Sequence, residues 1–305
     1  MPELPVQAVG FVGLGRMGDP MVRRLAAAGV DVRGHDAAPG PRTVFADLVT
    51  IVDKPAEVVP VTGEGPPVVV LMLPDSNVVE AVLGEGLLDA LTPGTLLVDM
   101  GSSEPMRTKA LAERVAARGA VMIDAPVSGG VSGATAGTLT IMVGGPDAEV
   151  ASITPLLAAL GRVRHVGPVG AGHALKALNN LMSASHLLAS SEALLAGERF
   201  GLDPAVMLDA VNGSSGRSGS TENKWPNFVL PETYNSGFAL ALMVKDIRIA
   251  LGLAEATGAP SALAARTVEL WSEAAAALAP DADHTEIVRW LRAGESTDPD
   301  PRSDR

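Results

Sequence analysis

Apolar and polar positions alternate in two different ways along the chain, and the pattern changes near residue 168. Before that point, short apolar runs separate amphipathic stretches with helical spacing. The run 68–74 (VVVLMLP) is fully apolar, which is typical of a strand in a parallel sheet covered on both faces. The alternation therefore predicts an α/β domain with a doubly wound, mostly parallel sheet. Strands are expected at 7–12, 31–36, 68–74, 95–103, 120–130, 137–145 and 162–167, with helices at 20–29, 78–90 and 104–119.

The second half of the chain has the helical period throughout. The stretch 170–200 lacks proline, and after its opening turn it has glycine only near its far end, so it predicts a helix on the order of 45 Å long. This helix is too apolar for the surface of one monomer, so we expect helices of two subunits to pack together in a homodimer or homotetramer. Further helices are expected at 204–211, 240–257, 261–278 and 284–291, and 212–237 is expected to be an irregular binding loop.

The predicted organisation has three parts. They are a dinucleotide-binding domain at 1–168, an all-helical domain at 169–295 for substrate binding and oligomerisation, and a tail at 296–305 of disordered composition. On the long helix, Lys176 and Asn180 lie four residues apart on one face, with Ser183 near the same stripe. A lysine in apolar surroundings has a lowered pKa and suits proton transfer. The alternative is a solvated lysine at a helix start.

Composition limits the classes of function. The net charge of -12 argues against a nucleic-acid partner. Cysteine is absent, and the five histidines lack ligand-type spacing, so neither a disulfide nor a metal site is expected. The sequence has no uninterrupted run of about 18 apolar residues, so no membrane span is expected. The beginning of the chain lacks the pattern of a secretion signal, so a cytoplasmic location is expected.

A glycine-rich turn follows the first predicted strand. Gly13, Gly15 and Gly18 form GxGxxG between a strand and a helix, and Asp36 ends the second strand about 20 residues later. Glycines let the backbone approach a pyrophosphate, the helix N-terminus favours its charge, and the acid binds ribose hydroxyls. This predicts a Rossmann-type NAD site; a carboxylate at 36 would repel the 2′-phosphate of NADP. The turn also contributes Leu14, Arg16 and Met17 to this site.

Three further strand ends carry residues suited to ligand binding: Leu73-Pro74, Ser102-Ser103 and Ser128-Gly129-Gly130. In an open α/β sheet these ends meet at the carboxyl edge, where ligands bind.

Four blocks in order resemble the β-hydroxyacid dehydrogenase family, which includes 3-hydroxyisobutyrate dehydrogenase and tartronate semialdehyde reductase. They are GFVGLGRMGDPM (10–21), DAPVSGG (124–130), GHALKALNN (172–180) and KDIRIA (245–250), and the resemblance covers about 10–290. It implies that Leu73, Pro74 and Ser102 line the cofactor site. It further implies that Lys176 transfers the proton and Asn180 orients the substrate. The implied substrate-binding residues are Ser128, Gly129 and Gly130, with Lys245 closing over cofactor and substrate.

The expected activity is therefore hydride transfer between NAD and a small anionic 3-hydroxy acid of the 3-hydroxyisobutyrate or 3-hydroxypropionate type. A reductase of an aldehyde acid such as tartronate semialdehyde stays open, as does an imine reductase, although those relatives usually replace the helix lysine. From a different class, the chain could be a non-catalytic NAD-sensing or chromatin-reader relative. A chromatin reader would need an added basic or aromatic module, which the chain lacks. The sequence departs from many relatives at Gly101, where they have serine, and this suggests a looser nicotinamide pocket.

Overall fold

The computed structural model describes residues 6–61 and 65–294, and the predicted tail at 296–305 lies outside them. The chain divides into two compact units, with the division between Lys176 and Ala177. The sequence pattern predicts a boundary at 168/169 instead, because the chain leaves its last strand there. The long helix thus begins as part of the first unit and continues into the second.

The first unit is built on one sheet. Its strands are β1 (Ala8–Val12), β2 (Asp31–His35), β3 (Thr50–Ile51), β4 (Val68–Leu71), β5 (Leu96–Asp99), β6 (Val121–Asp124), β7 (Val127–Ser128), β8 (Leu139–Gly144) and β9 (Gly161–Gly167). Their order is β3-β2-β1-β4-β5-β6-β8-β7, with β9 also paired to β8. The pairs are parallel except for β6 with β8 and β7 with β8, which are antiparallel. The prediction of a mostly parallel, doubly wound sheet is confirmed.

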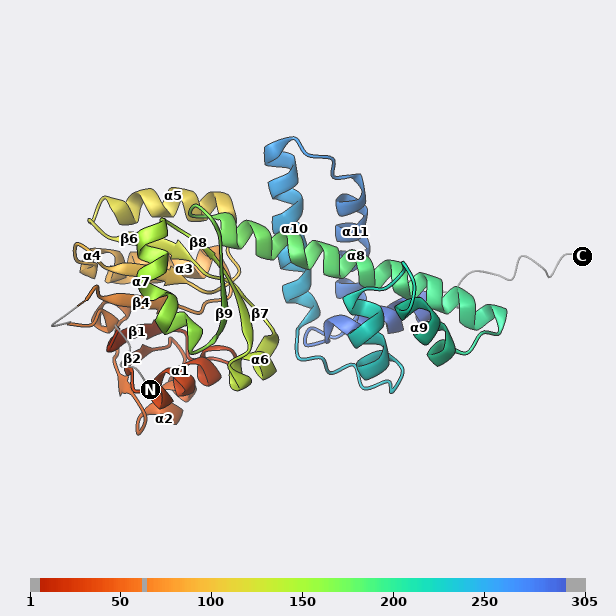
Figure 1. Cartoon of the computed structure of the whole chain (residues 1–305), viewed down its shortest axis with the longest axis horizontal. Helices are drawn as coiled ribbons and strands as arrows, with labels where there is room; N and C mark the ends of the chain where they lie inside the picture. The colour runs from red at the N-terminus through yellow and green to blue at the C-terminus, as the bar shows by residue number, and fades with distance from the viewer. Residues whose placement is uncertain (1–5, 62–64, 295–305) are drawn as a thin grey trace, which may run out of the picture. The chain divides into compact units, whose positions relative to one another are not determined.

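The helices of the first unit cover both faces of this sheet (Figure 1). They are α1 (Gly18–Ala27), α2 (Pro39–Phe45), α3 (Ser76–Val82), the π-helical turn η2 (Leu83–Leu87), α4 (Leu88–Ala90), α5 (Pro105–Ala116), α6 (Gly130–Ala136) and α7 (Asp147–Ala158), with the short 3₁₀ helix η1 (Pro55–Val58). Strand β4 shows why its sequence is wholly apolar. Val68 and Val70 belong to the core under α1 and α7, whereas Val69 and Leu71 belong to the core under α3 and α5.

Two predictions in this unit need correction. The expected helix at 78–90 is interrupted, because Gly86 has a φ of +98° that leaves the α conformation. The expected strands 68–74 and 95–103 end at Leu71 and Asp99, so Leu73-Pro74 and Ser102-Ser103 lie in loops after the strands. Strand β3 and helices α2, α6 and α7 are additional to the prediction, since each is short or mixed with the glycines and prolines that usually mark loops.

The second unit is helical in its described residues. The long helix α8 (Ala171–Phe200) enters it, followed by α9 (Pro204–Asn212), the π-helix η3 (Ser220–Val229), α10 (Leu240–Thr257), α11 (Ala262–Ala277), the 3₁₀ turn η4 (His284–Glu286) and α12 (Ile287–Gly294). Helices α10 and α11 form a hairpin (Figure 1). No helix of the described residues is both long and apolar enough to span a membrane.

The expectation of an irregular loop at 212–237 is wrong for its central part, which is wound into η3 despite Pro226. The reason is burial. Trp225 is fully buried in the core of the helical unit, and its indole Nε1 donates to Ser191 Oγ of α8 at 3.2 Å. Tertiary packing thus imposes helical winding on a segment whose Gly, Ser and Asn content is typical of loops.

Candidate active site

The glycine-rich turn at the end of β1 is shaped by close backbone packing. Gly13 has a φ of +98°, and a Cβ there would lie 2.3 Å from Met72 O. A Cβ on Gly18 would lie 1.9 Å from Gly13 O. A Cβ on Gly15, by contrast, would meet nothing within 4 Å. Gly13 and Gly18 are therefore required by the fold, whereas Gly15 leaves open space beside the turn. This geometry fits a dinucleotide, whose pyrophosphate needs close access to the backbone at a helix N-terminus.

Asp36 fixes the same turn from the end of β2. Its Oδ2 accepts a hydrogen bond from Leu14 N at 2.8 Å, and its Oδ1 accepts one from Ala38 N at 2.8 Å. The carboxylate thus stands beside the turn, where the sequence predicts ribose binding. Arg42 is engaged elsewhere, pairing with Asp53 at 3.3 Å and donating to Ala37 O.

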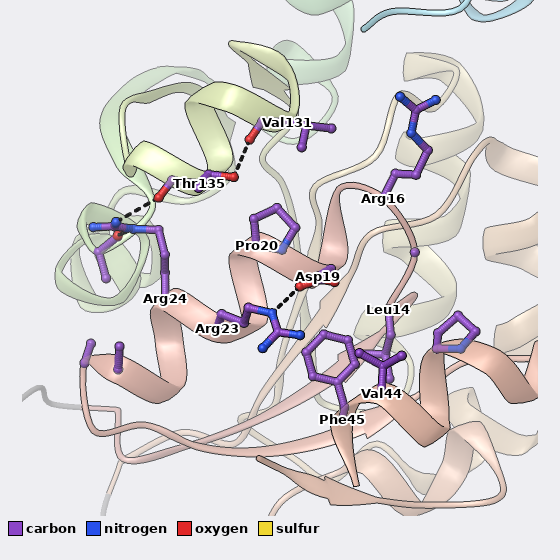
Figure 2. Close-up of a pocket in the computed structure, with 15 residues that line it drawn as sticks. Leu14, Arg16, Asp19, Pro20, Arg23, Arg24, Val44, Phe45, Val131 and Thr135 are labelled. Atoms are coloured by element: carbon purple, nitrogen blue, oxygen red, sulfur yellow. Dashed lines mark hydrogen bonds and ion pairs between the residues drawn. The ribbon is translucent and has the colours of Figure 1, made fainter. Parts of the chain in front are cut away.

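A groove of about 980 Å³ runs along the outer face of α1, toward α2 and α6 (Figure 2). Leu14, Gly15 and Arg16 line one end of it, and these are the predicted cofactor residues it includes. Along its length, Arg23 pairs with Asp19 at 2.5 Å (Figure 2). The groove therefore touches the glycine-rich turn, and its lining also includes Val131, which directly follows the turn at 128–130.

The loops after β4 and β5 are held against each other. Asp99 is fully buried, accepting from Gly101 N at 2.9 Å and from Ser103 Oγ at 2.7 Å. A Cβ on Gly101 would lie 2.4 Å from Leu73 O. Glycine at 101 thus permits a close approach of these two loops, whereas the sequence resemblance led us to expect a looser nicotinamide pocket. The structure places Leu73, Pro74 and Ser102 in these two neighbouring loops.

Ser128 ends the short strand β7 and leads into a turn of two glycines. Gly129 and Gly130 have φ values of +132° and +62°, which disfavour any residue with a side chain. Helix α6 begins at Gly130, and a Cβ on Gly130 would meet nothing within 4 Å. The three residues therefore form an open turn of backbone groups and one hydroxyl, which suits the binding of a small anion.

The beginning of α8 is fastened by a buried network that sequence reasoning missed. Asp124 Oδ1 accepts from Gly170 N at 2.6 Å, and its Oδ2 accepts from His173 N at 2.8 Å. His173 Nδ1 lies 2.8 Å from Thr108 Oγ1 of α5. Burial raises the pKa of Asp124. The network ties the first turn of α8 to the sheet. It therefore fixes the backbone position of Lys176, which lies one turn later. Asp124 and His173 lie in two of the four blocks that resemble the family, and this was the available sequence signal for the network.

Lys176 and Asn180 are both largely buried, with 9% and 6% of their surface exposed. Asn180 Nδ2 donates to Asp246 Oδ2 of α10 at 2.6 Å, and Lys245 Nζ lies 2.8 Å from Asp246 Oδ1. The structure thus connects two predicted residues, Asn180 and Lys245, through Asp246, to which the sequence assigned no role. Its place beside Lys245 in KDIRIA is the signal that was available.

One more cation lies beside the same helix. Lys224 of η3 donates from Nζ to Ser183 Oγ of α8 at 2.7 Å, and burial lowers its pKa to about 8. Of the other side chains in the segment 212–237, Arg217 and Glu222 are exposed and pair with each other at 3.6 Å, and Trp225 lies in the core. No group of three or more metal-ligating side chains occurs within the described ranges.

Comparison with known proteins agrees with this arrangement. Residues 8–170 match the profile of the NAD binding domain of 6-phosphogluconate dehydrogenase, and residues 170–291 match the NAD-binding profile of NADP-dependent 3-hydroxyisobutyrate dehydrogenase. The mitochondrial 3-hydroxyisobutyrate dehydrogenase of Bos taurus is 37% identical over 94% of this chain and 88% of its own length. That of Pseudomonas aeruginosa is 38% identical over 90% of this chain and 94% of its own.

Among solved structures, 3-hydroxyisobutyrate dehydrogenase of Mycobacterium tuberculosis with L-serine superposes with a TM-score of 0.87. It has 32% identity and covers 94% of this chain and 99% of that one. The fold of the described residues agrees with that of this relative over most of both chains. The chain therefore belongs to the β-hydroxyacid dehydrogenase family, oxidoreductases that use a nicotinamide dinucleotide.

Proposed function

We propose that this protein transfers a hydride between NAD and a small 3-hydroxy acid of the 3-hydroxyisobutyrate or 3-hydroxypropionate type. The observation that carries the proposal is Lys176, a lysine only 9% exposed, one turn after the fastened start of α8 and one turn before Asn180. A buried lysine is costly, since its charge loses solvation, and such a group is retained where a proton must be moved. The relatives named 3-hydroxyisobutyrate dehydrogenase support the choice of substrate class.

Bound NAD would be held by the turn Gly13–Gly18, Asp36 and the loops containing Leu73, Pro74 and Ser102, and it supplies the hydride acceptor. The hydroxy acid's carboxylate would bind the open turn at Ser128, Gly129 and Gly130. Lys176 accepts the hydroxyl proton during oxidation and returns it from its ammonium during reduction. Asn180, fixed by Asp246, orients the hydroxyl, while Lys245 adds positive charge for the carboxylate.

Replacing the proposed base tests the assignment. Lys176→Ala is expected to keep NAD binding, measured by fluorescence titration, and to lower turnover of 3-hydroxyisobutyrate by at least about 10²-fold, the scale of one acid–base group. Lys109→Ala, which removes an exposed lysine of α5, serves as the matched control and should leave turnover unchanged. Near-normal turnover in Lys176→Ala would exclude Lys176 as the base.

We propose NAD as the preferred cofactor. The carboxylate of Asp36 lies beside the glycine-rich turn, and Arg42 is engaged with Asp53. Support for this choice is electrostatic, since a carboxylate disfavours a 2′-phosphate. Initial rates with NAD and NADP, for the protein and for Asp36→Ser, test it. The preference should weaken in the variant; an unchanged ratio would assign selectivity to other residues.

The same residues serve a reductase of an aldehyde acid such as tartronate semialdehyde, because the proton moves in the opposite direction through the same lysine. An imine reductase is less well supported, because Lys176 is retained. Rates of NADH formation with 3-hydroxyisobutyrate, 3-hydroxypropionate, serine and glycerate, and of NADH oxidation with tartronate semialdehyde and a cyclic imine, distinguish these activities.

We also propose self-association through α8. Leu175, Leu178 and Met182 form an apolar stripe on this helix and are 37%, 37% and 52% exposed. Water contact along such a stripe is unfavourable, which supports a second copy covering it. Light scattering after gel filtration should give a dimer or tetramer, and Leu178→Glu should give a smaller species; a wild-type monomer would contradict this.

A further inference from the structure

The ammonium of Lys224 lacks an acidic partner in the part of the chain that the structure describes. Within those residues, its hydrogen-bonding neighbour is the hydroxyl of Ser183, at 2.7 Å, and no carboxylate lies within 4 Å of it. Burial lowers its pKa to about 8, because the charged ammonium loses solvation at this position. Cations with this degree of burial are normally paired with a carboxylate.

Asp283 is the carboxylate whose charge acts on the pKa of Lys224, but its oxygens already accept hydrogen bonds from other groups. Asp283 accepts hydrogen bonds from Ser236 Oγ at 2.8 Å, from Gly237 N at 2.8 Å and from Thr285 Oγ1 at 2.7 Å. The neighbouring His284 is buried, and burial lowers its pKa, which favours the neutral imidazole and leaves no charge there to pair with Lys224. The acid of this cluster therefore serves the turn around η4 rather than Lys224.

The position of Ser183 relates this cation to the proposed chemistry. Ser183 lies three residues after Asn180 and seven after Lys176, so the three side chains share one stripe of α8. Side chains three residues apart on a helix have Cβ atoms roughly 5–6 Å apart. The Lys224 ammonium is thus about one helical turn beyond the group proposed to orient the reacting hydroxyl.

We propose that Lys224 and Ser183 bind a second carboxylate on the substrate, so that the preferred hydroxy acid is a dicarboxylate. The inference rests on the proposed function and narrows its substrate class. In 2-(hydroxymethyl)glutarate, which keeps the reacting centre of 3-hydroxyisobutyrate, the hydroxyl-bearing and distal carboxyl carbons are roughly 5 Å apart at about 1.5 Å per bond. That span matches the spacing of Asn180 and Ser183. The ammonium and the hydroxyl would both donate to the distal carboxylate.

The test compares this dicarboxylate with its monoamide, in which the distal carboxylate is an uncharged amide of the same shape. A charge-assisted hydrogen bond contributes about 1.5–3 kcal/mol, so the wild-type protein should prefer the dicarboxylate by about 10–150-fold in kcat/KM. In Lys224→Met the preference should fall to near unity, and Lys224→Arg should restore part of it. Lys109→Met, which removes an exposed lysine, should keep the wild-type ratio. NAD titration and a melting curve establish that each variant is folded.

The outcomes separate the inference from the proposed function. Turnover of 3-hydroxyisobutyrate with no preference for the distal carboxylate overturns the inference and leaves the proposed function in place. A preference that persists in Lys224→Met also overturns it, because another group would then bind the carboxylate. If no hydroxy acid is turned over, both fail together.

Discussion

Asp246 is the residue through which the helical unit holds two proposed functional groups, so its charge should control both stability and rate. Asp246→Asn keeps the shape of the side chain and removes the charge. The amide can still accept from Asn180 Nδ2, but the ion pair with Lys245 is lost. The variant therefore isolates the electrostatic part of the arrangement.

The magnitude follows from the burial of each partner. Asp246 is 2% exposed, whereas the Lys245 side chain is 23% exposed and keeps part of its solvation. Breaking a fully buried pair costs about 3–5 kcal/mol, and the solvation of Lys245 brings the expected loss to about 2–3 kcal/mol. For a unit of this size, each kcal/mol shifts Tm by about 2–4 °C, so a fall of roughly 5–10 °C is expected.

The assay is a melting curve combined with steady-state rates well below Tm. Because Asn180 then donates to a neutral amide that no longer pairs with Lys245, its position is less firmly held, and kcat for the hydroxy acid should fall by about 10–100-fold while NAD affinity is retained, the scale expected when a reacting group is misplaced by about 1 Å. Asp209→Asn, on the exposed side of α9, is the control for removing one carboxylate. An Asp246→Asn protein with unchanged Tm and unchanged kcat would refute the reasoning, because Asn180 would then need no charged partner.

Two further predictions concern the glycine-rich turn and Lys224. Gly18→Ala places a Cβ 1.9 Å from Gly13 O and should lower both Tm and NAD affinity, whereas Gly15→Ala, with open space, should lower NAD affinity at unchanged Tm; equal effects on Tm would disprove this division of roles. The pKa of Lys224 falls from 10.5 to about 8 on folding, so the unfolded chain binds more protons between these pH values and the free energy of unfolding should rise with pH there, by up to about 3 kcal/mol. Denaturant titrations should show this rise in the protein and its loss in Lys224→Met; parallel pH profiles would count against a buried ammonium.

Local pattern was enough to predict the elements with strong periodicity. The helix at 240–257 was placed at its observed ends, and α8 differs from its prediction by one residue, because neither contains a proline or a glycine that stops it. Strand β4 was visible because both of its faces are buried. The glycine-rich turn was predicted for the right physical reason, since close packing at Gly13 and Gly18 is a property of the backbone itself.

The rest depends on contacts between distant residues. Trp225 winds η3 because its side chain is buried against Ser191, which is 34 positions earlier. Asp246 gains its importance only from Asn180, 66 positions away, and Asp124 only from the start of α8. A carboxylate in a helix or at a strand end is expected to be solvated until its partner is known. This is why the sequence indicated Lys176 and Lys245 but not Asp124 and Asp246.

The distribution of charge along α8 explains how an acidic protein could select an anion. The chain has a net charge of -12, which repels anionic substrates at long range, but salt limits that repulsion to about 8 Å at physiological ionic strength. Recognition is then decided by the groups in contact with the substrate. The acid of α10 pairs with Lys245, and the oxygens of Asp283 accept hydrogen bonds from the turn around η4. Lys224 of η3 donates to a hydroxyl of α8 instead of a carboxylate, and so its positive charge beside this helix is available to a ligand.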